Sequence, residues 1–253
     1  MTDPERRFAG TAPHYAAHRP GYPAQAVTDV ADRAGLDGSG RVLDVGTGTG
    51  RLAAAFADRA GEVVAIDPNP AMVERARERV SRTGKANVTV RNGSDTDLGD
   101  EGPLRLTTIG RAFHWLDQEH TLARLAAMTE PGGGVALFDD EGWLLRGTAL
   151  WQATVYDVVS EFADPPERTG PQTYERTWAD VIRASQFSGV ETREYEQEQV
   201  WTIESIVGYV LSLSYCDPVR ENREAFERAV RARLDGPYER TATVETTVGL
   251  LGE

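Results

Sequence analysis

The stretch RVLDVGTGTG, residues 41–50, decides the fold that we expect for the whole chain. Val42, Leu43 and Val45 are β-formers in a short apolar run, which predicts a buried strand. Glycines follow at every second position, and the Ala-rich residues 51–59 predict a helix. Glycines allow a tight turn and let a ligand approach bare backbone. Strand, glycine turn and helix together predict the start of a nucleotide-binding βαβ unit.

A second predicted strand, residues 62–66, ends in Asp67, and Pro70 is well placed in the first turn of the next helix. An acid at the end of the second strand can accept hydrogen bonds from two ribose hydroxyls. Asp67 therefore indicates a ligand that contains adenosine, such as NAD or S-adenosylmethionine. The alternative for Asp67 is an acid that only stabilises the helix N-terminus.

The spacing of the glycines distinguishes between these two ligands. A dinucleotide fingerprint is G-x-G-x-x-G, and its third glycine position falls here on Arg51. The chain instead has D-x-G-x-G-x-G, which resembles the first motif of class I S-adenosylmethionine-dependent methyltransferases. In that family the turn holds the methionine part of the cofactor. The resemblance implies cofactor contacts from the turn and from the second strand and its helix, at Asp44, Gly46, Thr47, Gly48, Gly50, Asp67, Pro68 and Met72.

The resemblance extends to the segment before the first strand. Residues 15–23 have the pattern Y-x-x-x-R-P-x-Y-P, which is common in small-molecule methyltransferases of this class. There the tyrosine and arginine close over the cofactor, which implies cofactor contacts for Tyr15 and Arg19 and a substrate contact for Tyr22. Arg19 could pair with the cofactor carboxylate. The alternative is a segment that simply packs on the sheet.

A polar loop follows the third predicted strand, residues 87–91. In the family the residues after this strand contact the adenine ring, and an acid commonly accepts from its exocyclic amine. The resemblance places that contact on Asp95, with Ser94 or Thr96 beside it. Loops rich in such polar residues are common without any ligand, so a plain surface loop is the alternative.

The fourth predicted strand, residues 104–109, ends in a cluster that resembles the A-F-H-W sequence of a methyltransferase subgroup. The carboxyl ends of parallel strands are where ligands bind in open α/β sheets. The resemblance implies cofactor contacts at Arg111 and Ala112, and substrate contacts at Phe113, His114 and Trp115. Arg111 departs from the subgroup, which usually has a small or polar residue there. His114 is the candidate general base, because histidine titrates near neutral pH; it could instead only bond the backbone, and Trp115 could be core.

The expected fold is α/β: a Rossmann-like, doubly wound, mostly parallel seven-stranded sheet with an antiparallel final strand and a helical cap over the active-site mouth. Motif placement carries the resemblance over residues 8–140. We predict an N-terminal covering segment at 1–40, a cofactor-binding core at 41–140, and a C-terminal half at 141–253 that completes the sheet and sets substrate specificity.

The amino-acid composition limits the kinds of molecule that the protein is expected to bind. The 253 residues carry a net charge of −13, which argues against binding nucleic acid or an anionic membrane surface. A single cysteine, Cys216, excludes a disulfide framework and favours a reducing cytoplasm. Four scattered histidines and one cysteine have no metal-ligand spacing, so we expect no metal. The expected partner is a small-molecule acceptor, with a monomer and a homo-oligomer both open.

Methyl transfer from a sulfonium is a direct displacement, so the protein mainly positions the acceptor and excludes water. We therefore expect transfer to O or N, or to C, of a small molecule, and the resemblance implies specialised-metabolite biosynthesis. An acidic, aromatic mouth favours a neutral or cationic acceptor such as an amine. One alternative is an NAD-dependent oxidoreductase, although the third fingerprint glycine and a Tyr-x-x-x-Lys pair are missing and Lys85 is the only lysine. The other is a non-catalytic member of the fold that binds the cofactor.

Overall fold

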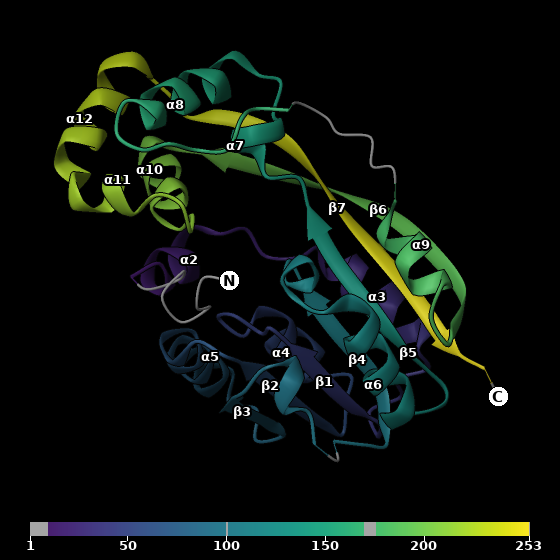
Figure 1. Ribbon diagram of the computed structural model, residues 1–253. Helices are drawn as coiled ribbons and strands as arrows, with labels where there is room; N and C mark the ends of the chain where they lie inside the picture. The colour runs from purple at the N-terminus through teal and green to yellow at the C-terminus, as the bar shows by residue number, and fades with distance from the viewer. Residues whose placement is uncertain (1–9, 100, 170–175, 253) are drawn as a thin grey trace. The chain divides into compact units, whose positions relative to one another are not determined.

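The computed structural model describes residues 10–99, 101–169 and 176–252. Seven strands form one sheet in the order β3-β2-β1-β4-β5-β7-β6 (Figure 1). The strands are β1 (Arg41–Val45), β2 (Glu62–Asp67), β3 (Val88–Asn92), β4 (Leu104–Gly110), β5 (Thr129–Asp140), β6 (Phe187–Trp201) and β7 (Tyr238–Leu251). Strands β3, β2, β1, β4 and β5 pair in parallel, whereas β7 runs antiparallel to β5. The predicted seven-stranded sheet with an antiparallel final strand is confirmed.

Helices connect the strands in the alternating order that a doubly wound sheet requires. The helices are α2 (Ala12–His18), α3 (Ala24–Arg33), α4 (Arg51–Phe56), α5 (Pro70–Thr83), α6 (Gln118–Met128), α7 (Trp143–Arg146), α8 (Leu150–Ser160), α9 (Trp178–Arg183), α10 (Ile203–Leu211), α11 (Asp217–Glu221) and α12 (Arg223–Arg233). Two short 3₁₀ helices follow β3 and β4, η1 (Asp95–Asp97) and η2 (Phe113–Trp115).

The chain divides into two compact units. The helical unit comprises residues 1–20, 141–174 and 196–243, and the sheet unit comprises 21–140, 175–195 and 244–253. Of these, residues 1–9, 100, 170–175 and 253 lie outside the described part. Strands β6 and β7 carry residues of both units. These two units differ from the predicted segments 1–40, 41–140 and 141–253. Those segments were defined by function, and they stay a prediction.

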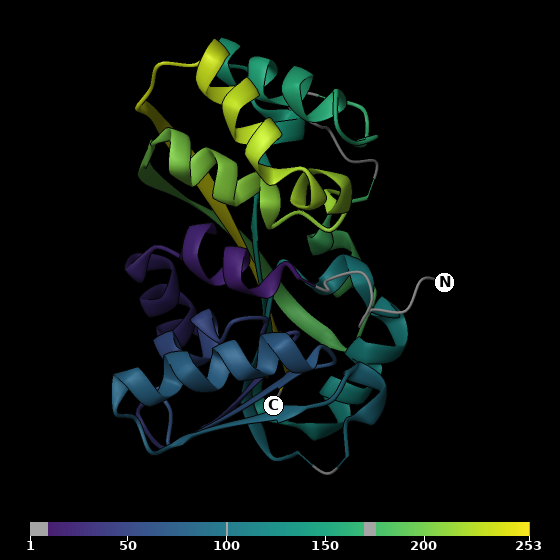
Figure 2. The same ribbon diagram turned by 90° about the vertical axis from the view of Figure 1, so that its left-hand side faces the viewer.

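In the sheet unit, helices cover both faces of the sheet. Successive strand residues point to opposite faces, so Val42 packs with α3, α4 and α5, whereas its neighbour Leu43 packs with α6 and α9. The same alternation separates Phe138 from Leu137 on β5. In Figure 2 the long blue helix α5 lies in front of the strands that it covers. An apolar layer of helices thus covers each face of the sheet. The candidate site lies at the polar ends of the strands.

The helical unit has a core of its own. Trp143 is buried at its centre, with ring centroids 4.7 Å from Tyr209, 4.8 Å from Trp151 and 5.1 Å from Trp201. Helix α2 packs on α10 in this unit. The prolines and mixed residues of 8–23 are typical of an irregular segment, so α2 is not evident from the sequence alone. The placement of this unit as a cap over the strand ends stays a prediction. Among the described residues, no helix has the length and apolarity to cross a membrane.

Two further elements differ from expectation. Residues 219–234 have the apolar pattern of one amphipathic helix, but Asn222 has φ −112° and ψ 29° and separates α11 from α12. Its side-chain amide donates to Pro218 O at 2.9 Å, which satisfies the end of α11. Strand β5 begins at Thr129 and includes three consecutive glycines, residues 132–134, which are usually uncommon within a strand. At Gly134 a Cβ would come within 2.5 Å of Gly249 O, so close strand pairing explains the glycine there.

Candidate functional site

The glycine turn between β1 and α4 leaves bare backbone at one point. Gly46, Gly48 and Gly50 all have positive φ, at 66°, 55° and 74°. A Cβ on Gly46 would meet the Ala112 side chain at 2.6 Å, so this position is closed by the loop after β4. A Cβ on Gly48 would have no protein atom within 4 Å. The turn is therefore open at Gly48, where a ligand can approach the main chain.

Asp44 holds this turn from within. Its side chain is buried, and its carboxylate accepts hydrogen bonds from Thr47 Oγ1 at 2.5 Å and Thr108 Oγ1 at 2.8 Å. The backbone N–H of Ala53 donates to it at 3.2 Å. Burial raises the pKa of Asp44 to about 6, despite these hydrogen bonds. The structure therefore shows Asp44 and Thr47 bracing the turn, and their direct cofactor contacts stay predictions.

Asp67 joins the end of β2 to the open glycine. The Gly48 N–H donates to Asp67 Oδ2 at 2.8 Å, and the Asn69 N–H donates to Oδ1 at 2.9 Å. Burial raises the pKa of this carboxyl, and the two backbone bonds act in the opposite direction. The side chain is 8% exposed, so the acid lies at the edge of the open turn. Each oxygen keeps a lone pair with which it can accept a hydroxyl.

The start of α5 is fixed beside this acid. Asn69 caps the helix by accepting from the N–H groups of Ala71 and Met72 at 2.9 and 3.2 Å. Pro68 is half-buried, and its carbonyl accepts from the Asn92 side chain at 2.9 Å. Met72 is buried in the sheet unit. The predicted cofactor residues Pro68 and Met72 thus lie at one strand end with Asp67.

The predicted adenine loop forms the short helix η1. Ser94 caps it, donating to Asp97 Oδ2 at 2.9 Å and accepting from the Thr96 N–H at 3.3 Å. Asp95 Oδ2 accepts from Thr121 Oγ1 at 3.0 Å, which ties the loop to α6. Ser94 and Asp95 are half-buried and Thr96 is exposed. The loop is ordered by its own bonds, and the adenine contact stays a prediction.

Arg111 stands in an unusual conformation directly after β4. It is the one described non-glycine residue with positive φ, 54°. Its Nε pairs with Asp140 Oδ1 at 2.6 Å, and its guanidinium lies 4.7 Å from the ring centroid of Tyr22. Tyr22 also packs edge-on against Phe138 at 5.3 Å. Arg111 and Tyr22, predicted as cofactor and substrate contacts, form a packed ion pair and cation–π stack at the strand ends.

The A-F-H-W cluster divides between core and surface. Phe113 is 3% exposed and packs edge-on against Trp178, with centroids 5.3 Å apart. It is therefore part of the core, and its contact with a substrate stays a prediction. His114 is exposed, and its ring lies 4.5 Å from that of Trp115, which is 49% exposed. Trp115 is thus on the surface rather than in the core, and these two rings are open to a substrate.

Four residues that we did not predict complete this region. Asp139 and Asp140 end β5, Glu245 lies opposite Asp139 on β7, and Trp178 Nε1 donates to Asp139 Oδ2 at 3.2 Å. Burial raises the pKa of Asp139, and Asp140 raises it further. Two consecutive acids after the apolar run 135–138 were the signal that could have indicated this strand end. Nothing comparable in the sequence indicates Trp178.

Tyr15 and Arg19 lie in the helical unit. The guanidinium of Arg19 lies 5.1 Å from the ring centroid of Tyr15 and 4.5 Å from that of Tyr209. Its Nε donates to Ser212 Oγ at 2.8 Å. The structure thus brings Tyr15 and Arg19 together on α10, and their contact with the cofactor stays a prediction. In the part of the chain that the structure describes, no group of His, Cys, Asp and Glu side chains could hold a metal ion.

Known proteins have sequences similar to parts of this chain. A family model described as a methyltransferase domain matches residues 42–133. An uncharacterised methyltransferase of Mycobacterium tuberculosis, Rv3342, is 26% identical over 210 residues, which are 83% of this chain and 77% of the relative. Part of the chain is thus similar to methyltransferases. The matched domain begins at β1 and ends within β5, so it contains the glycine turn and three strand ends of the site.

Solved structures share the fold of this chain. A putative type II methyltransferase from Anaeromyxobacter dehalogenans has a TM-score of 0.59 at 22% identity, covering 92% of this chain and 97% of that one. A phosphoethanolamine N-methyltransferase from Haemonchus contortus has a TM-score of 0.52 at 16% identity, covering 90% of this chain and 53% of that one. These likenesses show the fold alone.

Proposed function

We propose that this chain transfers a methyl group from S-adenosylmethionine to O, N or C of a small molecule. The observation that carries the proposal is the open face of the turn at Gly48, whose N–H is bonded to Asp67 at the end of β2. Bare backbone and a ribose-accepting acid thus lie at one place. A relative with the same fold, the Haemonchus enzyme, holds S-adenosylhomocysteine, which supports this choice of cofactor.

The residues present fit such a cofactor. Ribose hydroxyls need acceptors, and Asp67 keeps a lone pair on each oxygen. The space at Gly48 would be filled by a Cβ, so the turn admits a ligand only because the residue is glycine. When bound, the cofactor would supply an activated methyl group. The glycine spacing that departs from the dinucleotide fingerprint speaks against the NAD-dependent alternative.

On the acceptor side, the exposed rings of His114 and Trp115 are the surface that we assign to substrate. Trp115 offers an apolar face, and His114 can take the proton of an O–H or N–H nucleophile. The acids Asp139, Asp140 and Glu245 outnumber Arg111 at these strand ends, which favours a neutral or cationic acceptor such as an amine. We extend the proposal to a cytoplasmic role in specialised-metabolite biosynthesis, by family resemblance.

Calorimetric titration with S-adenosylmethionine, S-adenosylhomocysteine and NAD tests the cofactor. We expect the first two to bind, and Asp67→Ala to abolish binding because it removes the ribose acceptor and frees the Gly48 N–H. Asp37→Ala is the matched control, since this exposed acid bonds only within its own loop before β1. Binding of NAD alone would overturn the proposal.

The acceptor is tested by a methyl-transfer screen against amines, phenols and carboxylates. Turnover with amines would support the charge argument, and a preference for carboxylates would contradict it. Cofactor binding without turnover on any acceptor would instead favour a non-catalytic member of the fold.

A further inference from the structure

Arg79 on α5 is a half-buried cation that the proposed function does not use. Its Nε donates to Thr49 O at 2.8 Å, and Thr49 lies between the last two glycines of the turn. Burial lowers the pKa of Arg79, and Arg82 lowers it further. The charged side chain is thus partly removed from water at the point where it bonds the turn.

The same face of α5 packs on the next residue of the turn. A Cβ on Gly50 would lie 3.0 Å from the Ala76 Cβ, which is tighter than an ordinary contact. Ala76 precedes Arg79 by three positions, so both side chains are on one face of α5. Helices α4 and α5 also contact each other on one face of the sheet (Figure 2). The turn therefore meets α5 at two consecutive residues, Thr49 and Gly50.

Two side chains hold the peptide groups on either side of the open position. The Gly48 N–H donates to Asp67 Oδ2 at 2.8 Å. The carbonyl of Thr49, in the peptide that joins Thr49 to Gly50, accepts from Arg79. The peptide that joins Gly48 to Thr49 lies between these two bonds. Because glycine rotates more freely about its backbone bonds than other residues, the two bonds limit which way the backbone groups of the turn point.

We propose that Arg79 is a positioning residue for cofactor binding, which fixes the Thr49 carbonyl so that the main chain at Gly48 is already in its binding conformation. The inference rests on the proposed function, in which the open face of the turn admits S-adenosylmethionine. A turn that is ordered before the ligand arrives loses less conformational entropy on binding. Arg79 acts through the turn and needs no contact with the cofactor itself.

The alternative is that Arg79 acts by its charge, attracting an anionic group of the ligand. The two mechanisms can be separated because the bond to the turn comes from Nε. A glutamine side chain places its amide nitrogen as many bonds from Cα as the arginine Nε, so Arg79→Gln removes the charge and keeps an N–H donor. Methionine is of similar length and has no donor, so Arg79→Met removes both the charge and the bond.

Calorimetric titration of the full chain with S-adenosylmethionine tests the proposal. We expect Arg79→Met to weaken binding by about tenfold, because a hydrogen bond of ordinary strength no longer orders the turn. Arg79→Gln should return the affinity to within about twofold of the wild type. Wild-type affinity in Arg79→Met would overturn the proposal. Equal losses in Arg79→Met and Arg79→Gln would overturn it too, because the charge would then matter instead of the bond.

Arg77→Met is the matched control. Arg77 is on the same helix, and its Nε and Nη2 donate to Val90 O on β3 at 3.2 and 3.1 Å. The substitution makes the same change in charge and side chain and leaves the bond to the turn intact, so wild-type affinity is expected. An equal loss of affinity in both methionine variants would overturn the proposal. So would thermal unfolding that shows Arg79→Met unable to fold where Arg77→Met folds, because Arg79 would then serve the fold as a whole.

Amide hydrogen exchange without cofactor separates this result from the proposed function. The N–H groups of Gly48 and Gly50 are both hydrogen-bonded. They should exchange about tenfold faster in Arg79→Met, and near the wild-type rate in Arg79→Gln and Arg77→Met. Unchanged rates in Arg79→Met would overturn the proposal. If the wild type itself does not bind the cofactor, the proposed function fails, while the exchange rates still decide whether Arg79 orders the turn.

Discussion

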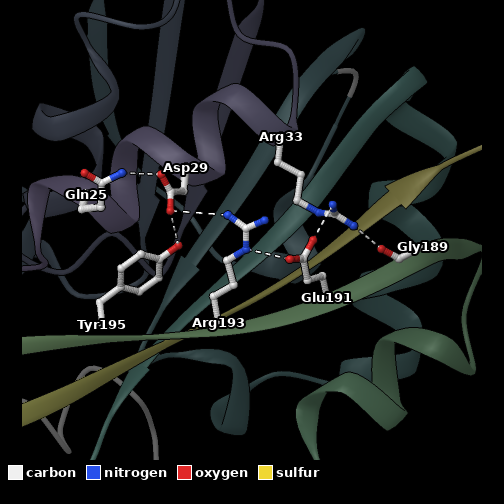
Figure 3. Close-up of polar contacts among 7 residues, drawn as sticks. All are labelled: Gln25, Asp29, Arg33, Gly189, Glu191, Arg193 and Tyr195. Atoms are coloured by element: carbon white, nitrogen blue, oxygen red, sulfur yellow. Dashed lines mark hydrogen bonds and ion pairs between the residues drawn. The ribbon is translucent and has the colours of Figure 1, made fainter.

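Two groups of acids in the sheet unit are held in opposite ways. Asp44, Asp67 and Asp139 lie at strand ends, and burial raises the pKa of each. Asp29 on α3 and Glu191 on β6 belong to a charged network between these two elements, shown in Figure 3, and their pKa values are lowered. Acidic residues are therefore buried with raised pKa values at the strand ends and paired with arginines, with lowered pKa values, in the network.

The charged network consists of Gln25, Asp29, Arg33, Glu191, Arg193 and Tyr195, and it joins α3 to β6 (Figure 3). The hydrogen bond from Gln25 is the largest cause that lowers the pKa of Asp29, and Tyr195 and Arg193 contribute further. Arg33 pairs with Glu191 at 2.6 Å and also donates to Gly189 O. Glu191 is stabilised as an anion mainly by the hydrogen bond from Arg193.

The comparison shows how burial without a neighbouring cation makes ionisation of a carboxyl group unfavourable. At the strand ends the acids are bonded to neutral donors, which support a precise turn but leave the charged form unfavourable. In the network each acid meets an arginine, so ionisation and folding favour each other. Acids with raised pKa values lie where a ligand is expected. Acids with lowered pKa values lie where α3 and β6 are joined by ion pairs.

The largest expected effect concerns the pH dependence of stability. The pKa of Asp44 is raised to about 6 from 3.8, so its contribution to stability is greatest in acid and is lost as pH rises through about pH 6. Relative to Asp44→Asn, the wild type should lose at most about 3 kcal/mol between pH 4 and pH 7, by the usual conversion of a pKa shift. Urea unfolding across this range measures it.

Asp29→Asn should change the pH dependence of the unfolding free energy in the opposite direction in the same experiment. Because the pKa of Asp29 is lowered, its contribution is present above the unfolded value and is lost as pH falls through the folded one. If both variants change the pH profile in the same direction, the comparison between strand-end and network acids is wrong.

The second prediction compares two glycines that differ only in location. Gly48 and Gly84 have φ of 55° and 70°, and neither position would bring a Cβ within 4 Å of another group. Alanine at either should cost about 1 kcal/mol of folding free energy through backbone strain. Only Gly48→Ala should also weaken S-adenosylmethionine binding, by about tenfold or more, because it fills the open face of the turn.

Thermal unfolding and calorimetry on the two variants measure both effects. Equal cofactor affinity in Gly48→Ala and Gly84→Ala would show that the open turn is not the binding surface. Unequal stability would show that the strain at the two positions differs.

The smallest expected effect is at the charged network. Arg33→Ala removes the pair with Glu191, and a partly exposed ion pair contributes little. The fall in Tm should be at most about 4 °C and should shrink at high salt, because screening weakens the pair in the wild type. Thermal unfolding at low and high ionic strength tests this. A salt-independent fall would mean that Arg33 acts by packing instead.

The sequence predicted those parts of the fold whose signal is local. β1 and β2 are short apolar runs that end at Asp44–Val45 and Asp67, and the glycines follow directly. Helix α2 was missed because APHYAAH has a proline and no apolar period, and packing on α10 supports it. Contacts between residues nearly two hundred positions apart leave no local pattern.

The same reasoning explains the outcome at the candidate site. The strand-end motif indicated His114 but could not divide Phe113, which is core, from the exposed Trp115. That division depends on Trp178, which packs on Phe113 from a helix 65 residues further along the chain. Asp139 escaped notice for the same reason, since its partner Trp178 is 39 residues away.

The position of β7 has a consequence for synthesis on the ribosome. β7 lies between β5 and β6 in the sheet, yet it is made after both. Until residues 238–251 have left the exit tunnel, β5 presents an unpaired edge and β6 has no neighbour. Such an edge is prone to pairing with other chains. The nascent chain therefore exposes an unpaired β5 edge until its final strand has been made.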